Sequence, residues 1–209
     1  MRAFWILGIA MAAGMSANAQ NCVVALYVST DLSLPTAMLS LAEIRTSAIF
    51  HNIGVTVRWR IGAPTARAAH DACGEPLAVR IENSAQANVT AEALAYSAPF
   101  ADSGVSIHVL LDRVMRIGPA SYAPVVLAYV MAHEIAHVLE RTGAHSRDGV
   151  MKAHWDRSDY WRMESGGLAF SAEDVESIHS GIAYRVRHAG RNETSMNGEA
   201  LSERLVSHE

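Results

Sequence analysis

The chain has 209 residues, a formal net charge of −4, and hydrophobic residues at half of its positions. This length suits one ordinary domain with a buried core, and the apolar content excludes a chain that is disordered throughout. Basic and acidic residues nearly balance, with 17 Lys+Arg against 21 Asp+Glu. A dedicated nucleic-acid-binding protein normally shows a basic surplus, so we expect no nucleic-acid partner.

The first residues have the pattern of a secretory signal peptide. Arg2 supplies a positive charge, residues 4–15 form an almost continuous apolar run, and Ala17-Asn18-Ala19 fits a cleavage site. We therefore predict a signal peptide over 1–19, a catalytic domain over 20–189 and a polar tail over 190–209. The mature protein would be periplasmic or extracellular, with no stable membrane insertion. An uncleaved membrane anchor is the alternative.

Two cysteines, Cys22 and Cys73, lie in the mature part of the chain. Two cysteines in an exported protein predict one disulfide bond between them. The alternative is a lipid-modified Cys22, which needs a small residue just before the cysteine. Asn21 stands at that position, so we favour the disulfide.

Hydrophobic periodicity predicts most elements of the first half of the chain. β-Forming or alternating residues predict strands over 23–29, 55–61 and 77–81, and apolar residues at helical spacing predict an amphipathic helix over 35–51. Residues 62–75 have the composition of a loop. The stretch 83–103 is ambiguous, with a short helix near 90–96 as one interpretation.

The second half predicts one more strand and two helices. Residues 105–111 alternate as in a strand, and a long helical pattern runs from Ser121 to about Thr142, with Gly143 as its cap. After a loop, Ser171 and Asp174 resemble a capping box that starts a helix over 172–188. The element order predicts an α+β fold: a small twisted mixed β-sheet, a backing helix, an active-site helix and a C-terminal helix.

The string His133-Glu134-Ile135-Ala136-His137 is an H-E-x-x-H motif inside the long predicted helix. Residues four apart lie on one side of a helix, so the two imidazoles can bind one Zn²⁺. Glu134 can then take a proton from the attacking water as general base. The motif predicts one catalytic zinc ion held by His133 and His137.

A catalytic zinc usually has a third protein ligand. The downstream candidates are His145, Asp148, His154 and Glu164. We predict His145, because the turn expected at Gly143 would direct the chain back toward the metal. Asp148 beside Gly149 suits a turn better, and Gly166 and Gly167 weaken the helix that Glu164 would need.

The stretch from His133 to Met151 resembles the metzincin metalloproteases. Their pattern is H-E-x-x-H-x-x-G-x-x-H followed by a methionine turn, and Gly149-Val150-Met151 resembles that turn. This chain departs from the pattern in having Glu140 in place of the glycine and a longer gap before His145. Over about 23–188 it also resembles small exported bacterial zinc proteases. The resemblance implies a metzincin-like fold and zinc-dependent proteolysis.

The function predicted from these features is an exported zinc metallopeptidase that hydrolyses peptide bonds of peptide or protein substrates. One alternative is a zinc hydrolase of a non-protein amide or a cell-wall peptide, whose metal chemistry would be identical. The other is a secreted protein that binds zinc without catalysis. An intact Glu134 favours the enzyme, because a purely structural zinc site needs no general base.

Overall fold

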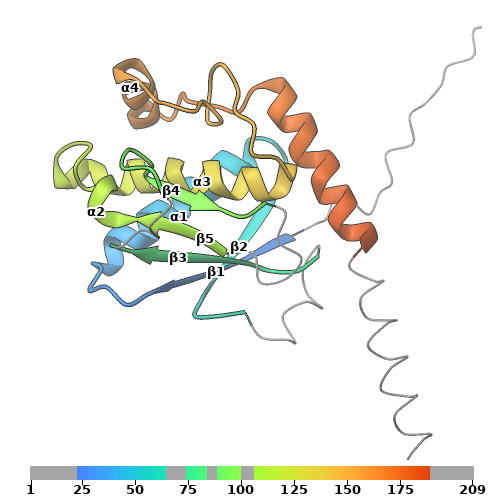
Figure 1. Cartoon of the computed structure of the whole chain (residues 1–209), viewed down its shortest axis with the longest axis horizontal. Helices are drawn as coiled ribbons and strands as arrows, with labels where there is room; N and C mark the ends of the chain where they lie inside the picture. The colour runs from blue at the N-terminus through green and yellow to red at the C-terminus, as the bar shows by residue number, and fades with distance from the viewer. Residues whose placement is uncertain (1–22, 65–73, 84–88, 100–105, 189–209) are drawn as a thin grey trace, which may run out of the picture.

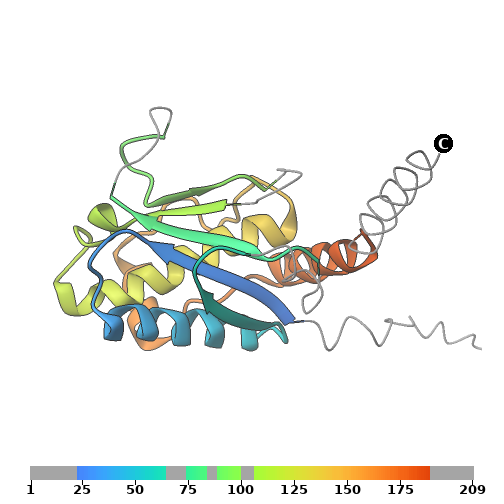
Figure 2. The same cartoon turned by 90° about the horizontal axis from the view of Figure 1, so that it is seen from below.

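The structure, a computed structural model, describes residues 23–64, 74–83, 89–99 and 106–188. The predicted signal peptide, the predicted tail after 189 and both cysteines lie outside these residues, so those expectations stay predictions. In the described part, helices lie against one face of a five-stranded sheet (Figures 1 and 2).

The sheet has the strand order β2-β1-β3-β5-β4 and is mostly parallel. Its strands are β1 (Val23–Thr30), β2 (Thr56–Ile61), β3 (Leu77–Glu82), β4 (Ala95–Ser97) and β5 (Ser106–Leu110). Strands β2, β1, β3 and β5 pair in parallel, and β4 pairs antiparallel with β5 at the edge. The mixed sheet that the sequence predicts is therefore present.

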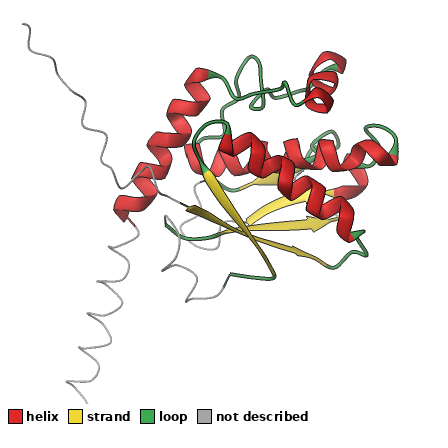
Figure 3. Ribbon diagram, turned by 180° about the vertical axis from the view of Figure 1, so that it is seen from behind, coloured by secondary structure: helices red, strands yellow, loops and turns green. Residues whose placement is uncertain are grey.

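Two helices cover one face of this sheet and lie side by side, as Figure 2 shows from below and Figure 3 from behind. Helix α1 (Thr36–His51) connects the parallel strands β1 and β2, and helix α3 (Ala123–Glu140) follows the short 3₁₀ helix η2 (Ala120–Tyr122). Thr46 joins the two helices, because its buried hydroxyl donates to the carbonyls of Ala42 and Ala128 at 2.8 and 3.1 Å.

Helix α3 is the centre of the core. Every residue from Val125 to Leu139 is buried, as expected of a helix that is apolar on all sides. The segment Ala120–Glu140 is long and apolar enough to cross a membrane, yet 89% of its most apolar window is buried inside the fold. Its apolar character is therefore explained by packing within the domain.

The structure differs from the expected elements in three places. Residues 95–97, within the stretch that the sequence leaves ambiguous, form strand β4. Strand β5 ends at Leu110, and the short helix α2 (Leu111–Val114), which was not predicted, follows it directly. Helix α4 (Arg157–Ser165) extends across residues 162–165, which were expected to form a loop. It starts with a capping box in which the Asp156 side chain accepts from the N–H groups of Ser158 and Asp159.

The helix over 172–188 agrees with the prediction and packs across the end of α3. Its capping box is formed: the Ser171 N–H donates to Asp174 at 2.9 Å and the Asp174 N–H donates to the Ser171 hydroxyl at 3.1 Å. Gly181 is where the two helices meet. A Cβ on Gly181 would overlap the carbonyl oxygen of Leu139, so this contact needs glycine.

Gly181→Ala is expected to destabilise the protein by about 3 kcal/mol, because the two helix backbones must separate to admit a methyl group. For a domain of this size, the melting temperature should fall by about 6–12 °C. Gly143→Ala is the matched control, since a Cβ at Gly143 would meet nothing within 4 Å. Equal melting temperatures for the two variants would show that the helices do not meet at Gly181.

Candidate metal centre

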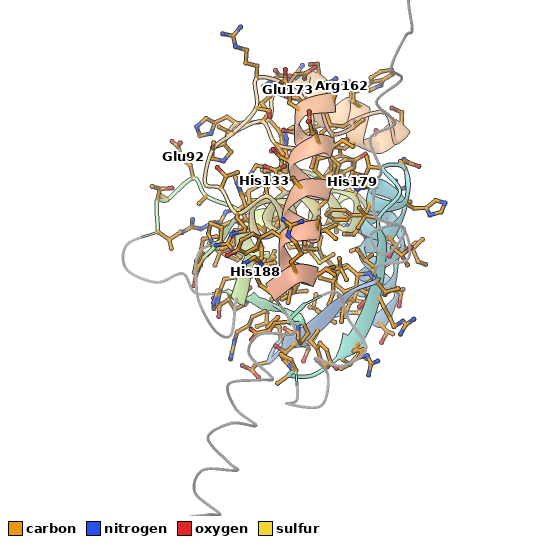
Figure 4. The ribbon with its side chains drawn as sticks, turned by 90° about the vertical axis from the view of Figure 1, so that its right-hand side faces the viewer. Glu92, His133, Arg162, Glu173, His179 and His188 are labelled. Atoms are coloured by element: carbon orange, nitrogen blue, oxygen red, sulfur yellow. The ribbon has the colours of Figure 1, made fainter. Side chains whose placement is uncertain are left out.

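Helix α3 presents His133, Glu134 and His137 near its C-terminal end. The two histidines lie one turn apart on the same side of the helix, and their rings meet edge to face with centroids 4.6 Å apart. All three side chains are at least nine-tenths buried. In Figure 4, His133 lies toward the middle of the view, whereas Glu92, on the loop before β4, lies at its outer edge.

The chain reverses after α3 and brings His145 to the same place. Arg141 takes the left-handed conformation that ends the helix, with φ 57° and ψ 44°, and its N–H donates to the carbonyl of His137. The prediction that Gly143 caps this helix is therefore wrong. The His145 ring centroid lies 5.3 Å from that of His133 and 4.9 Å from that of His137.

The three imidazoles form a group that could hold a metal ion. One nitrogen from each of His133, His137 and His145 lies within 4.8 Å of the others. In the part of the chain that the structure describes, Glu134 is not a member of this group. Three protein donors with an acidic side chain beside them match the donor set of a catalytic zinc site, which keeps one position open.

Backbone carbonyls fix the orientation of the two buried rings. The Nδ1 atom of His133 lies 2.8 Å from the carbonyl oxygen of Val150, and that of His137 lies 2.9 Å from the carbonyl oxygen of Thr142. A carbonyl can only accept a hydrogen bond, so each Nδ1 carries the proton. The Nε2 atom of each neutral ring then carries an unprotonated lone pair.

These two lone pairs face each other at short range. The Nε2 atoms of His133 and His137 are 3.0 Å apart. Both rings are neutral at physiological pH, because burial, together with neighbouring histidines, lowers the pKa of each to about 4. Two nitrogens bound to one tetrahedral zinc at about 2.0–2.1 Å would lie about 3.3 Å apart. The separation of the two Nε2 atoms is therefore close to the one that a shared zinc ion would impose.

Glu134 points into the same region from the next position on α3. Burial raises the pKa of its carboxyl to about 7, and a hydrogen bond from Ser97 acts in the opposite direction. The Ser97 hydroxyl donates to Oε2 of Glu134 at 2.7 Å. A carboxylate held in this way is placed to exchange a proton with a group bound beside the histidines.

A cavity of about 480 Å³ opens onto the histidines. Its walls come from the edge of the sheet, from α3 and from the segment after His145; among its lining residues are Leu94, Ser97, Val130, His154, Trp155 and Tyr160. The Trp155 ring packs against His133 with centroids 5.5 Å apart, and Tyr160 packs against Trp155 at 6.4 Å. The cavity therefore places a mostly apolar surface next to the candidate metal site.

Contacts with helix 172–188 and within the turn itself hold the segment that follows His145 in place. The Ser146 hydroxyl donates to Asp174 at the start of helix 172–188, and the Ser146 N–H donates to the carbonyl of Met151 at 2.8 Å. Gly149 has φ 82° and lies against the backbone of Ala169, where a Cβ would not fit. Met151 is buried in this turn. The resemblance to a methionine turn stays a prediction.

Charged residues join this turn to helix α4. The Asp159 carboxylate is almost completely buried and accepts from Lys152 and Arg162, each at 2.6 Å, and from the N–H of Asp156 at 2.9 Å. Lys152 also pairs with Asp156 at 2.6 Å. Burial opposes ionisation of Asp159, but these partners hold its pKa below the ordinary value. The ionised carboxylate thus stabilises the rim of the cavity.

Asp159→Asn is expected to lower the free energy of unfolding at pH 7 by about 2–3 kcal/mol, because Lys152 and Arg162 lose their shared buried partner. A carboxyl group whose pKa is lower in the folded state stabilises the fold at pH values above its unfolded-state pKa of about 3.9. That contribution is lost as the pH falls through the folded-state pKa, so the gap between parent and variant should close below about pH 4. Urea unfolding at several pH values measures the gap.

Asp148→Asn is the control for this prediction. Asp148 also pairs with Arg162 at 2.6 Å, but its side chain is 68% exposed. An exposed ion pair contributes little, so this change should cost at most about 0.5–1 kcal/mol. A cost for Asp159→Asn no greater than for Asp148→Asn would contradict the account.

The other candidate ligands are not part of the three-histidine group in the described part of the chain. Asp148 is paired with Arg162, and Glu164 does not line the cavity in the described part of the chain. His154 does line it, and its proximity contributes to the lowered pKa of His145, of which burial is the larger cause. The structure thus brings His145 to His133 and His137. Metal binding by these three residues stays a prediction.

Sequence reasoning missed Ser97 and Asp174 as contributors to the site. Ser97 is 37 residues from Glu134, and Asp174 is 28 residues from Ser146. Neither residue belongs to a recognisable motif around the histidines. The capping box at Ser171 and Asp174 was the one available signal, and it indicated the start of a helix without indicating a contact with Ser146.

Comparisons with known proteins give little further information. No protein-family model matches this chain, and no curated protein matches it. Among solved structures, the chain is similar to the crystal structure of archaemetzincin from Methanopyrus kandleri. The two share 16% sequence identity with a TM-score of 0.44 over 77% of this chain and 96% of that chain. This likeness is too weak to assign a function to the chain.

Proposed function

We propose that this chain is an exported zinc-dependent peptidase in which His133, His137 and His145 hold one Zn²⁺ and Glu134 is the general base. The observation that carries this proposal is the convergence of unprotonated imidazole nitrogens beside a buried carboxylate. Imidazole nitrogens suit Zn²⁺, and three of them leave the position that a catalytic zinc needs for water or substrate.

The zinc ion and the residues around it would have separate roles in hydrolysis. A zinc ion bound here would polarise a substrate carbonyl and acidify water. Glu134 would take a proton from the attacking water as the water oxygen bonds to the carbonyl carbon. It would then give this proton to the leaving amine as the carbon–nitrogen bond breaks. The mostly apolar wall formed by Trp155 and Tyr160 would limit access of bulk water.

The position of β4 favours peptides as substrates. This strand pairs with β5 and lies at the edge of the sheet, and its residues line the cavity. An edge strand offers backbone N–H and C=O groups to an extended chain, which can add to the sheet as a further strand. A polypeptide aligned in this way would pass beside the three histidines.

The experiment uses the mature protein from residue 20 onward. We expect about one zinc per chain by elemental analysis, and cleavage within a mixture of fluorescence-quenched peptides. A chelator should abolish cleavage, and added zinc should restore it. Cell-wall stem peptides and small amides are tested in parallel, because their hydrolysis alone would replace the proposed substrate class.

Two outcomes would overturn the proposal. Full activity after exhaustive removal of metal would exclude zinc catalysis. Stable zinc binding without hydrolysis of any of these substrates would indicate a zinc-binding protein instead of an enzyme. Export is tested separately, by recovering the protein outside the cytoplasm with an N-terminus at Gln20.

A further inference from the structure

The Glu134 carboxylate is held from a different element of the fold. Ser97, the last residue of β4, donates its hydroxyl to Oε2 of Glu134 at 2.7 Å. Glu134 is only 8% exposed, so solvent contributes little to its orientation. A hydrogen bond to an ionised group is stronger than one between neutral groups. The hydrogen bond from Ser97 therefore fixes the orientation of the Glu134 carboxylate, with Oε2 directed toward Ser97.

Strand β4 is itself held in place from its opposite face. The Tyr96 ring stacks on the His108 ring, with centroids 4.6 Å apart and an interplanar angle of 1°. The Tyr96 hydroxyl donates to Oε1 of Glu82 at 3.2 Å, and Nδ1 of His108 lies 2.9 Å from the same oxygen. Successive side chains of a strand point to opposite faces, so fixing Tyr96 also fixes the direction of Ser97.

We infer that Ser97 is a positioning residue for the general base, an inference that rests on the proposed function. Its hydroxyl occupies Oε2 of Glu134 and leaves Oε1 to exchange the proton with water and with the leaving amine. Ser97 belongs to β4, the edge strand that would bind the substrate. The same strand would therefore align the peptide and orient the base that acts on it.

The test compares Ser97→Val with Ser97→Thr, two β-branched variants of similar volume that differ in the hydroxyl group. Ser97→Val should lower kcat by about 10–100-fold, the loss expected from one hydrogen bond to a charged group. Its KM should stay within about twofold, because the substitution removes the hydroxyl bonded to Glu134 and leaves the backbone of β4, which would align the peptide, in place. Ser97→Thr should restore kcat to within about threefold of the parent.

Two further measurements separate positioning from a general structural effect. Zinc content should be the same in the parent and both variants, since Ser97 bonds to Glu134 and is not in the candidate ligand group of the described chain. The second measurement is a double-mutant cycle on metal-free protein, with Ser97→Val, Glu134→Leu and the double variant. The change in melting temperature of the double variant should differ from the sum of the two single changes by about 3–6 °C. This cycle requires no substrate.

Equal kcat values for the Thr and Val variants, loss of zinc from Ser97→Val, or additive melting temperatures would each overturn the inference. A parent protein that hydrolyses none of the substrates would overturn the proposed function instead. The thermal cycle would then still decide whether Ser97 and Glu134 interact.

Discussion

Glu134→Gln is expected to lower the rate of hydrolysis by about 10²–10⁴-fold, the usual contribution of a general base. Glutamine has the shape of glutamate, and its side-chain oxygen can still accept from Ser97, so the fold should be preserved. The amide cannot take a proton from water. Zinc should remain bound, because Glu134 lies outside the group of candidate ligands among the described residues. Measurement of kcat/KM together with zinc content checks both expectations.

Glu140→Gln is the matched control for this change. Glu140 lies on the same helix, and burial followed by the proximity of Asp174 raises its pKa to about 7, as burial does for Glu134. It does not line the cavity in the described structure, so its replacement should change the rate by less than about threefold. A Glu134→Gln variant that hydrolyses as fast as the parent would remove Glu134 from the mechanism.

His137→Ala should abolish detectable hydrolysis by weakening zinc binding. Apparent zinc-binding free energies of about 10–16 kcal/mol for four-ligand sites correspond to about 2.5–4 kcal/mol per ligand. Loss of one ligand should therefore weaken affinity by about 10²–10³-fold. Competition with a chromophoric chelator measures this affinity in folded protein. His145→Ala should give a loss of similar size.

His154→Ala provides the control for the histidine variants. His154 lines the same cavity but is not part of the candidate ligand group in the described chain. Its replacement should leave zinc affinity within about threefold of the parent. A large loss at His154 with an unchanged affinity at His145 would reassign the third ligand.

Much of the framework could be predicted because its signals are local. The H-E-x-x-H residues fall on α3, and the helix over 172–188 begins at the capping box predicted at Ser171. Strands β1, β2 and β3 have bounds within one residue of those predicted. In each of these elements, periodicity and terminal residues agree with the tertiary packing.

The predictions failed where tertiary contacts or side-chain caps decide the local structure. Helix α4 has few apolar residues, and it forms because Asp156 caps its start and Gly166, with φ 75°, ends it. Gly166 was interpreted as a helix breaker. Arg141 adopts the left-handed conformation that was expected to require Gly143. Helix α1 also departs from the amphipathic pattern predicted for residues 35–51, because its apolar residues Leu41 and Ile44 are exposed.

In the candidate site, too, the local features could be predicted from the sequence and the long-range contacts could not. The spacing of His133 and His137 is a local property of a helix, and it can be recognised from five residues. The contacts of Ser97 with Glu134 and of Asp174 with Ser146 join segments far apart in the chain. No spacing rule predicts such pairs, because they depend on how β4 and helix 172–188 pack against α3.

The zinc site can be located by X-ray diffraction from crystals of the zinc-loaded mature protein, recorded on both sides of the zinc absorption edge. We expect one anomalous peak at about 2.0–2.1 Å from a nitrogen of each of His133, His137 and His145. The fourth position should be filled by water within reach of Glu134. No peak at these histidines, or a fourth protein ligand that closes the site, would contradict the claim.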